Sequence, residues 1–178
     1  MDEAAVEARN LVKDFGDKRA VDGVSLRVPT GTIYGILGPN GAGKTTTIRM
    51  LLGIIDPSSG TRRLLGSERP LEVAEQVGYL PEERGLYKKM KVRDVLRFLG
   101  ALKGLSQADA DRRIDAWLER LQLKSEAKDW STAKVDELSR GMQQKVQFTA
   151  TLLHDPELVI LDEPFSGLDP INAQAMKD

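Results

Sequence analysis

The feature that most constrains this chain is a glycine-rich segment that joins an apolar run at 33–37 to a helical pattern at 44–52. The segment has the spacing G-x-x-x-x-G-K-[ST] and consists of Gly38, Pro39, Asn40, Gly41, Ala42, Gly43, Lys44 and Thr45, followed by Thr46. Glycines let main-chain N–H groups close around phosphate oxygens, and the N-terminus of the following helix adds positive charge. The unbroken apolar run predicts a strand buried on both faces, the context that such a loop requires. The pattern therefore favours a phosphate-binding loop over a glycine-rich surface turn.

An acidic feature lies near the other end of the chain. The apolar run 158–161 predicts a buried strand, and Asp162 and Glu163 follow it directly. Taken alone, two such acids are more often a solvated strand end, but ligands bind beyond the carboxyl ends of parallel strands in doubly wound sheets. Beside a phosphate-binding loop, Asp162 is predicted to act in the magnesium shell and Glu163 on water. Lys44 is predicted to contact the β- and γ-phosphates, and the Thr45 hydroxyl to bind Mg²⁺.

Composition excludes several kinds of site. The 26 Lys and Arg residues nearly balance the 27 Asp and Glu residues, so a chain-wide basic surface for nucleic acid is not expected. Cysteine is absent, which excludes disulfides, thiol catalysis and cysteine-ligated metals. The single histidine, His154, excludes a site that needs two imidazoles. The sequence has neither an apolar membrane span nor a signal-peptide core, so the expected compartment is the cytoplasm.

The chain is predicted to fold as an α/β core that a different kind of segment interrupts. Strands are predicted over 6–12 and 24–28, because their apolar and polar residues suit half-buried strands. Ser139 is the predicted cap of a helix that ends near residue 153. We expect the core to comprise 1–85 and 136–178, with the interruption between them.

The segment 86–135 is predicted to be a helical subdomain, because its pattern is helical and heavily charged. Ser106 is the predicted N-cap of its second helix. The apolar positions form two stripes, which consist of Val92, Val95, Leu96, Leu99 and Leu102, and of Ile114, Trp117, Leu118 and Leu121. Phe98 and Trp117 are expected in the core of this subdomain, and its charges on a solvated face.

Further motifs give the chain a resemblance to the ATP-binding subunits of ABC transporters. Residues 138–142 resemble the family signature, which is usually written L-S-G-G-Q. They are Leu138, Ser139, Arg140, Gly141 and Met142. Another segment resembles the loop that crosses the family's dimer interface, and it consists of Ser166, Gly167, Leu168 and Asp169. Phe15 lies where the family stacks an aromatic ring on adenine. The resemblance covers essentially the whole chain, with agreement in motif order and spacing.

The resemblance implies a Mg²⁺-dependent ATPase with a P-loop NTPase sheet. Helices would cover both faces of this sheet, beside an N-terminal antiparallel β portion and the inserted helical subdomain. Two nucleotide-binding domains, from like or unlike chains, would close around ATP, with Ser139 and the N–H of Gly141 at the γ-phosphate held opposite. Glu163 would be the general base. Such a motor would lie on the inner face of the cell membrane and drive a permease, contacted by 86–135 near Tyr87 and Met90.

The chain departs from the family pattern at several positions. Arg140 and Met142 replace a glycine and a glutamine of the common signature. Glu82 stands where the family has a glutamine that contacts the magnesium shell, and its role is carried over because a carboxylate also offers oxygen acceptors. The stretch 84–90 is similar to the sodium-efflux (NatA-like) branch of ABC-2-type exporters.

The end of the chain departs most from the family pattern. The family has a later strand that ends in a switch histidine, and His154 precedes the acidic strand, so it is expected to pack or to cap a helix end. A new helix is predicted near Pro170. We interpret the chain as a C-terminally truncated domain, which we expect to bind and hydrolyse nucleotide less well than an extended version.

The competing interpretation is a soluble ABC-type ATPase that is not tied to transport. The type that acts on ribosomes usually carries two such domains, and the DNA-repair type carries a very long coiled coil, whereas this chain has 178 residues and a short insert. A P-loop kinase or GTPase is a third class, but a GTPase needs an N-K-x-D motif, which is absent, and a kinase would not need residues 138–141. The sequence favours the transporter motor and does not indicate what is transported.

Overall fold

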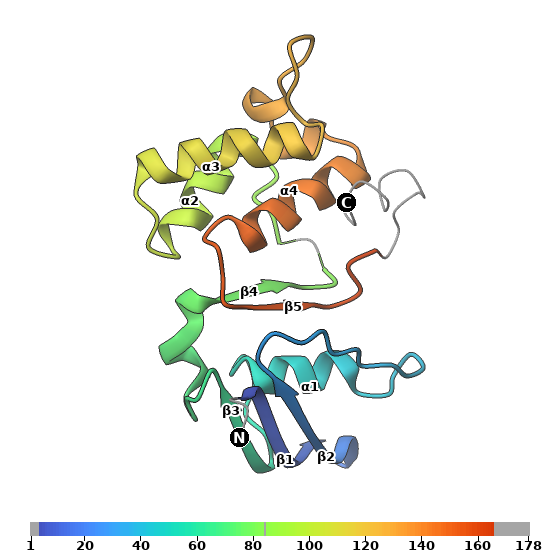
Figure 1. Ribbon diagram of the computed structural model, residues 1–178. Helices are drawn as coiled ribbons and strands as arrows, with labels where there is room; N and C mark the ends of the chain where they lie inside the picture. Colours follow the sequence, from blue (N-terminus) through green and yellow to red (C-terminus); the bar gives the residue numbers. More distant parts are fainter. Residues whose placement is uncertain (1–3, 84, 166–178) are drawn as a thin grey trace. The chain divides into compact units, whose positions relative to one another are not determined.

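The computed structural model describes residues 4–83 and 85–165, and the chain divides into two compact units, Met1–Ala74 and Glu75–Asp178 (Figure 1). Each unit is described by itself. Within the described part of the chain, no helix is long and apolar enough to cross a membrane. The expected division into a discontinuous core and a helical insert at 86–135 stays a prediction.

The first unit contains a three-stranded antiparallel sheet in the order β2-β1-β3. Its strands are β1 (Ala4–Phe15), β2 (Lys18–Pro29) and β3 (Ser59–Leu64). β1 and β2 include the strands predicted over 6–12 and 24–28, and the alternation of 24–28 does produce half-buried and exposed positions in turn. The strand β3 is not predicted, because only one of its six residues is apolar. The buried face of the sheet carries Val6, Ala8, Leu11, Val21 and Leu64.

Helix α1 (Lys44–Leu51) covers this buried face and confirms the helix predicted after the glycine-rich loop. Ile48, Met50 and Leu51 are buried, and they hold the helix against β1, β2 and β3. The loop therefore has a fixed end, because the helix that it opens is anchored in an apolar core.

The strand predicted over 33–37 is wrong for this unit. These residues have no regular secondary structure, and the side chains of Ile33 and Leu37 are almost completely exposed. A strand that is buried on both faces needs neighbouring strands and a layer on each side. Among the described residues of Met1–Ala74, every strand belongs to the antiparallel sheet, and none of them pairs with this run.

The second unit contains a parallel pair of strands, β4 (Val77–Leu80) and β5 (Leu158–Leu161). The 3₁₀ helix η1 (Pro70–Gln76) leads into β4 from the first unit. Gly78 lets α4 (Arg140–Leu152) approach β4 closely, because a Cβ at Gly78 would lie 2.5 Å from the carbonyl oxygen of Thr151. The prediction that β5 is a fully buried strand is wrong, since alternate residues of β5 stay exposed when only one neighbouring strand is present.

Three helices of this unit share one apolar core. They are α2 (Val92–Ala101), α3 (Gln107–Arg120) and α4, and the short 3₁₀ helices η2 (Trp130–Thr132) and η3 (Val135–Glu137) lie between α3 and α4. Both predicted stripes contribute to the core, whose buried members are Val92, Val95, Leu96, Ala110, Ile114, Leu118, Leu123, Val135, Leu138, Val146 and Leu153. The predicted cap is confirmed, because the Ser106 Oγ accepts a hydrogen bond from the Asp109 N–H at 3.1 Å.

Two residues predicted to be in the helical core are exposed. Leu102 is the C-cap of α2, and its side chain is 61% exposed. Phe98 is also exposed and meets Tyr87 in an edge-to-face contact, with ring centroids 5.5 Å apart. Trp117 is half-buried against the core, as predicted, and packs edge-to-face on Phe148.

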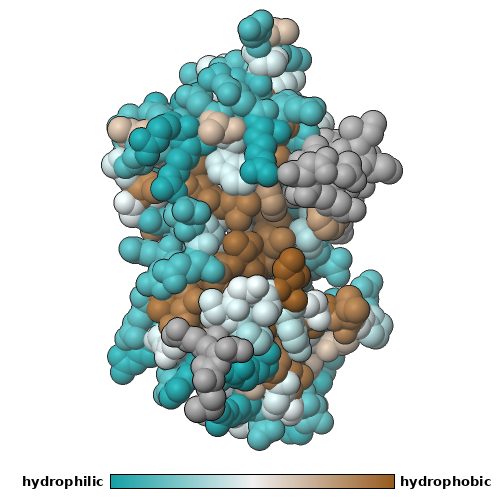
Figure 2. All heavy atoms as spheres, viewed as in Figure 1, coloured by the Kyte–Doolittle hydropathy of each residue, from teal (hydrophilic) through white to brown (hydrophobic). Residues whose placement is uncertain are grey.

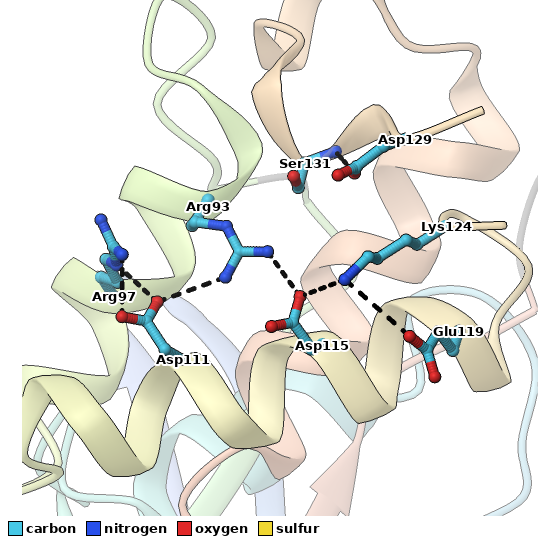
Figure 3. A network of polar contacts seen from close by, with 8 residues as sticks. All are labelled: Arg93, Arg97, Asp111, Asp115, Glu119, Lys124, Asp129 and Ser131. Carbon is cyan, nitrogen blue, oxygen red and sulfur yellow. Dashed lines mark hydrogen bonds and ion pairs between the residues drawn. The ribbon is translucent and has the colours of Figure 1, made fainter. Parts of the chain in front are cut away.

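The contact between α2 and α3 is completed by a network of ion pairs at its solvent side (Figure 3). Arg97 donates two hydrogen bonds to Asp111, and Arg93 reaches both Asp111 and Asp115. Lys124 also donates to Asp115, at 2.8 Å. These hydrogen bonds lower the pKa of Asp111, chiefly through Arg97, and the pKa of Asp115, chiefly through Arg93. Figure 2 shows mostly hydrophilic side chains over the region of α3, which agrees with the predicted solvated face.

Candidate functional site

The glycine-rich loop has a backbone that only glycine suits at two positions. Gly41 and Gly43 have φ angles of 81° and 87°, in the left-handed region that side chains disfavour. Gly43 is also pressed against β2, because a Cβ there would lie 2.5 Å from the carbonyl oxygen of Ala20. Gly43 accepts the first helical hydrogen bond of α1, from the Thr47 N–H at 2.8 Å. The loop is therefore held in a tight bend that ends at the N-terminus of a helix.

Within the described residues, no side chain caps the N-terminus of α1, and the first turn of this helix contains no acidic residue. Lys44 lies in that turn, and its Nζ donates to the carbonyl oxygens of Gly38 and Pro39, at 2.8 and 3.2 Å. Thr45 and Thr46 are half-buried in the same turn. A helix N-terminus without a side-chain cap, with a lysine folded over the preceding loop, is an arrangement suited to an anion.

Phe15 ends β1 at the turn into β2, and its ring is about half exposed. The Nζ of Lys13 lies 5.2 Å from the centroid of this ring. An exposed aromatic ring can stack on a nucleobase. The predicted role of Phe15 at adenine stays a prediction.

The predicted acids of the second unit gather where β4 and β5 end. Leu80 and Leu161 are paired residues of the two parallel strands, so the segments that follow them start side by side. The Asp162 N–H donates to the Leu80 carbonyl oxygen at 2.9 Å and extends this pairing by one residue. Glu82 and Glu163 therefore follow neighbouring strand ends, both with exposed side chains.

Asp162 and Glu163 differ sharply in their surroundings. Asp162 is 3% exposed, and its Oδ2 is buried without a hydrogen-bond partner among the described residues. Glu163 is exposed and has a φ of 52°, which is uncommon for a residue other than glycine. Strained backbone of this kind persists where the surrounding structure holds it, and it occurs often at functional sites.

The donor set suits a hard cation. Thr45, Glu82 and Asp162 offer oxygen atoms only, which is the ligand chemistry that Mg²⁺ prefers, and the buried unpartnered Oδ2 of Asp162 calls for a cation or a water. Within the described residues, no group of three or more His, Cys, Asp or Glu side chains is close enough to hold a metal alone. Thr45 belongs to the first unit and the two acids to the second, so a shared magnesium site stays a prediction.

The predicted signature begins α4. Ser139 is the N-cap, and its Oγ accepts from the Met142 N–H at 3.3 Å. Gly141 is buried, Met142 is half-buried against the apolar core, and Arg140 is exposed. The predicted helix boundaries are confirmed, with α4 ending at Leu152. The predicted interface loop, 166–169, and the helix predicted near residue 170 lie outside the described residues.

His154 packs at the end of α4, as the sequence predicts. Its Nε2 lies 3.2 Å from the carbonyl oxygen of Val77, to which Lys103 Nζ also donates at 3.0 Å. Burial lowers the pKa of His154, and Lys103 and Arg113 lower it further. His154 therefore packs as a neutral ring against the start of β4.

Polar residues on the inner face of α4 were not predicted from the sequence. Gln144, Gln147 and Thr151 are almost fully buried, and each contacts the backbone of a strand or of a loop that follows one. Their spacing of three and four residues places them on one helix face. That spacing, with polar side chains where a buried helix usually has apolar ones, was the signal available in the sequence.

Comparisons of the amino-acid sequence agree on one family. A family model described as "ABC transporter" matches residues 21–166. The chain is 49% identical over 169 residues to YhaQ of Bacillus subtilis, an ABC transporter ATP-binding protein, in an alignment that covers 95% of this chain and 55% of that protein. It is 43% identical over 173 residues to Nod factor export ATP-binding protein I of Paraburkholderia xenovorans, with 96% and 56% covered. The chain spans about half the length of these curated relatives.

A solved structure agrees with the sequence matches. It is described as the ATP binding subunit of an ABC transporter, and it superposes with a TM-score of 0.83 at 32% identity, over 97% of this chain and 71% of that chain. The likeness confirms the predicted α/β fold with its N-terminal antiparallel sheet and its helices. The family model matches most of a chain that has a glycine-rich bend before a helix and two acids after a strand, and this match shows that the chain belongs to the ABC transporter family.

Proposed function

We propose that this chain is the nucleotide-binding and ATP-hydrolysing part of a membrane transporter. The observation that carries the proposal is the bend at Gly41 and Gly43, which ends at an uncapped helix N-terminus with Lys44 folded over it. Such a bend presents several N–H groups and a lysine to one anion, as a triphosphate requires. Family membership adds the transporter context.

In this proposal, Lys44 leaves the loop carbonyls that it now contacts and binds the β- and γ-phosphates of ATP. Thr45, Glu82 and Asp162 would hold Mg²⁺, which supplies the positive charge that offsets the phosphates when it is bound. Glu163 acts as the general base that orients and deprotonates the attacking water. Phe15 stacks on the adenine ring.

The proposal includes a second nucleotide-binding domain and a permease. Ser139 and the N–H of Gly141 contact the γ-phosphate of ATP held by the partner domain, because a capped helix N-terminus favours an anion. Residues 166–169 lie at the same interface. A permease is contacted through 86–135, on the inner face of the cell membrane. The name of the Paraburkholderia relative, an export ATP-binding protein, supports a role in export and the exporter branch.

Calorimetric titration with ATP and Mg²⁺ tests the first step. Wild-type protein is expected to bind with a Kd in the micromolar range or below, and Lys44→Ala to lose at least tenfold in affinity, because one charge-assisted contact to phosphate is removed. Arg49→Ala, at an exposed position of the same helix, is the matched control and should bind as wild type does. Absence of binding by wild type contradicts the proposal. Co-purification of the chain with a membrane protein tests the transport step against a soluble ATPase.

A further inference from the structure

The inner face of α4 carries three buried polar side chains in one line. Gln144, Gln147 and Thr151 are 4%, 5% and 6% exposed, and they occupy positions i, i+3 and i+7 of the helix. Burying a polar group costs free energy unless the group is hydrogen-bonded, and apolar residues on this face would avoid that cost. We therefore attribute the polar side chains on this face to the hydrogen bonds that they make.

Both glutamines donate to a backbone carbonyl outside α4. Gln144 Nε2 donates to the Pro164 carbonyl at 3.3 Å, and Gln147 Nε2 donates to the Glu83 carbonyl at 3.2 Å. The single hydroxyl hydrogen of Thr151 is shared between the Gln147 carbonyl of α4, 3.0 Å from Oγ1, and the Tyr79 carbonyl inside β4, at 3.3 Å. The three contacts follow the helix from its signature end toward its C-terminus. They tie one rigid helix to the segment after β5, to the segment after β4 and to β4 itself.

The two glutamine contacts fall beside the predicted carboxylates. Pro164 directly follows Glu163, and Glu83 directly follows Glu82. Glu163 has a left-handed backbone that needs support from its surroundings, and the Gln144 contact lies on the next residue. Gln147 uses only its donor, because its Oε1 is buried without a partner among the residues that the structure describes.

We infer that Gln144 and Gln147 are positioning residues for ATP hydrolysis, acting through the backbones of Pro164 and Glu83. The inference rests on the proposed function. The two glutamines fix the distance between the acids at the strand ends and Ser139, the cap at the start of the same helix. A γ-phosphate contact at Ser139 then bears on both acids through one rigid element.

Kinetics of Gln144→Met and Gln147→Met test the inference in the full chain. Methionine has a similar length and no hydrogen-bond donor. The kcat for ATP is expected to fall about tenfold or more, because small misplacements of reacting groups are costly. The KM and the Kd for ATP should stay within about threefold of wild type, because the groups that bind phosphate are unchanged. A kcat equal to that of wild type in both variants overturns the inference.

Thr149→Val is the matched control on the same helix. Thr149 is fully buried, and its hydroxyl donates to the Lys145 carbonyl of α4 itself, at 2.9 Å. This substitution removes a buried hydrogen bond of α4 without touching either segment that carries the acids. It should lower the melting temperature without the loss of kcat. A loss of kcat as large as that in the glutamine variants would mean that any damage to α4 suffices, and the inference would be wrong.

Hydrogen–deuterium exchange gives a readout that needs no activity. In nucleotide-free protein, Gln147→Met should increase exchange at Glu82 and Glu83, and Gln144→Met should increase it at Glu163 and Phe165, with α4 itself unchanged in both. Unchanged exchange at these amides overturns the inference. If wild type does not hydrolyse ATP, the proposed function fails, and the exchange data still decide whether the glutamines hold these segments.

Gln147→Glu adds a pH profile that loss of packing would not produce. A neutral carboxylic acid can donate to the Glu83 carbonyl, whereas a carboxylate cannot. The kcat of this variant, divided by that of wild type at the same pH, should therefore rise as the pH falls. A ratio that is flat with pH contradicts a donor role for Gln147.

Discussion

The glycine-rich loop and the acidic strand ends achieve local order in different ways. In the loop, the order lies in the backbone itself, which bends at Gly41 and Gly43 and approaches the Ala20 carbonyl of β2 at Gly43. At the strand ends, the ordered segments carry acidic side chains, and a helix from elsewhere in the chain holds these segments. The loop is therefore specified by its own glycines and one close approach to a strand, and the strand ends by side-chain hydrogen bonds from α4.

This difference indicates which substitutions should affect nucleotide binding and which should affect ATP hydrolysis. Damage to the loop should affect both the fold of the first unit and nucleotide binding, because one backbone serves both. Damage at the strand ends should affect turnover first, because Glu163 is exposed and contributes little buried contact.

The largest effect is expected at the predicted general base. Glu163→Gln keeps the size of the side chain and removes its basicity, so turnover should fall about 10²- to 10⁴-fold while ATP still binds. Steady-state phosphate release and calorimetry with ATP measure the two quantities. Glu157 is an exposed acid that directly precedes β5, at the opposite end of the strand from Glu163. Glu157→Gln is therefore the control and should hydrolyse ATP as wild type does. Turnover that survives Glu163→Gln removes the general base from the proposal.

The next effect is expected in the loop, where two glycines form a matched pair. Gly43→Ala puts a Cβ 2.5 Å from the Ala20 carbonyl at a left-handed φ, and it should lower the free energy of unfolding by about 3 kcal/mol or more. Gly41→Ala has the same backbone region but no atom within 4 Å, so only the backbone cost of about 1–2 kcal/mol is expected. Urea unfolding measures both. Equal losses would mean that the close approach to β2 is unimportant.

A smaller effect is expected at the ion pairs between α2 and α3. Arg93→Met should lower the free energy of unfolding by about 1 kcal/mol, because the network is half-exposed and screened by water. The loss should shrink in 1 M salt. The loss should also shrink below about pH 4. The pKa values of Asp111 and Asp115 are lower in the folded protein than in the unfolded chain, so the stability that these carboxylates contribute is complete above their unfolded pKa. This contribution disappears as the pH falls through their folded pKa. Unchanged hydrogen–deuterium exchange at the amides of Glu82 and Glu163 in this variant would show that the ion-pair network does not influence the acids at the strand ends.

The smallest effect is expected at His154, which contacts the start of β4. Burial lowers its pKa in the folded protein, so the folded state binds fewer protons than the unfolded state. The unfolded chain has a His154 pKa of about 6.5, and above this pH the neutral ring contributes its full stability to the folded protein. This contribution is lost as the pH falls below that value. His154→Gln can keep the contact to the Val77 carbonyl without titrating. Its melting temperature should therefore fall less than that of wild type between pH 7.5 and 5.5, and parallel curves would contradict this assignment.

Much of the fold could be predicted because local patterns carry it. Alternation predicts the strands at 6–12 and 24–28, and Ser106 and Ser139 mark two helix starts through their capping hydrogen bonds. The strand β3 could not be predicted, since its residues are mostly polar and its pairing with β1 comes from the sheet. The exposed position of Leu102 could not be predicted either, because helical spacing shows a stripe but not how far the packing extends along it, whereas Phe98 lies outside the predicted stripe.

The sequence alone determined the bend before α1 and the residue types at the strand ends, because glycine spacing and adjacent acids act through the nearest few residues. Only the tertiary structure decided that Asp162 is buried, with an oxygen that has no partner among the described residues, while Glu163 is exposed, and that Gln144 and Gln147 contact the backbones beside the acids. The physical reason is that burial and long-range hydrogen bonds depend on which segments meet, and here α4 meets the ends of two strands that are about 80 residues apart in the chain.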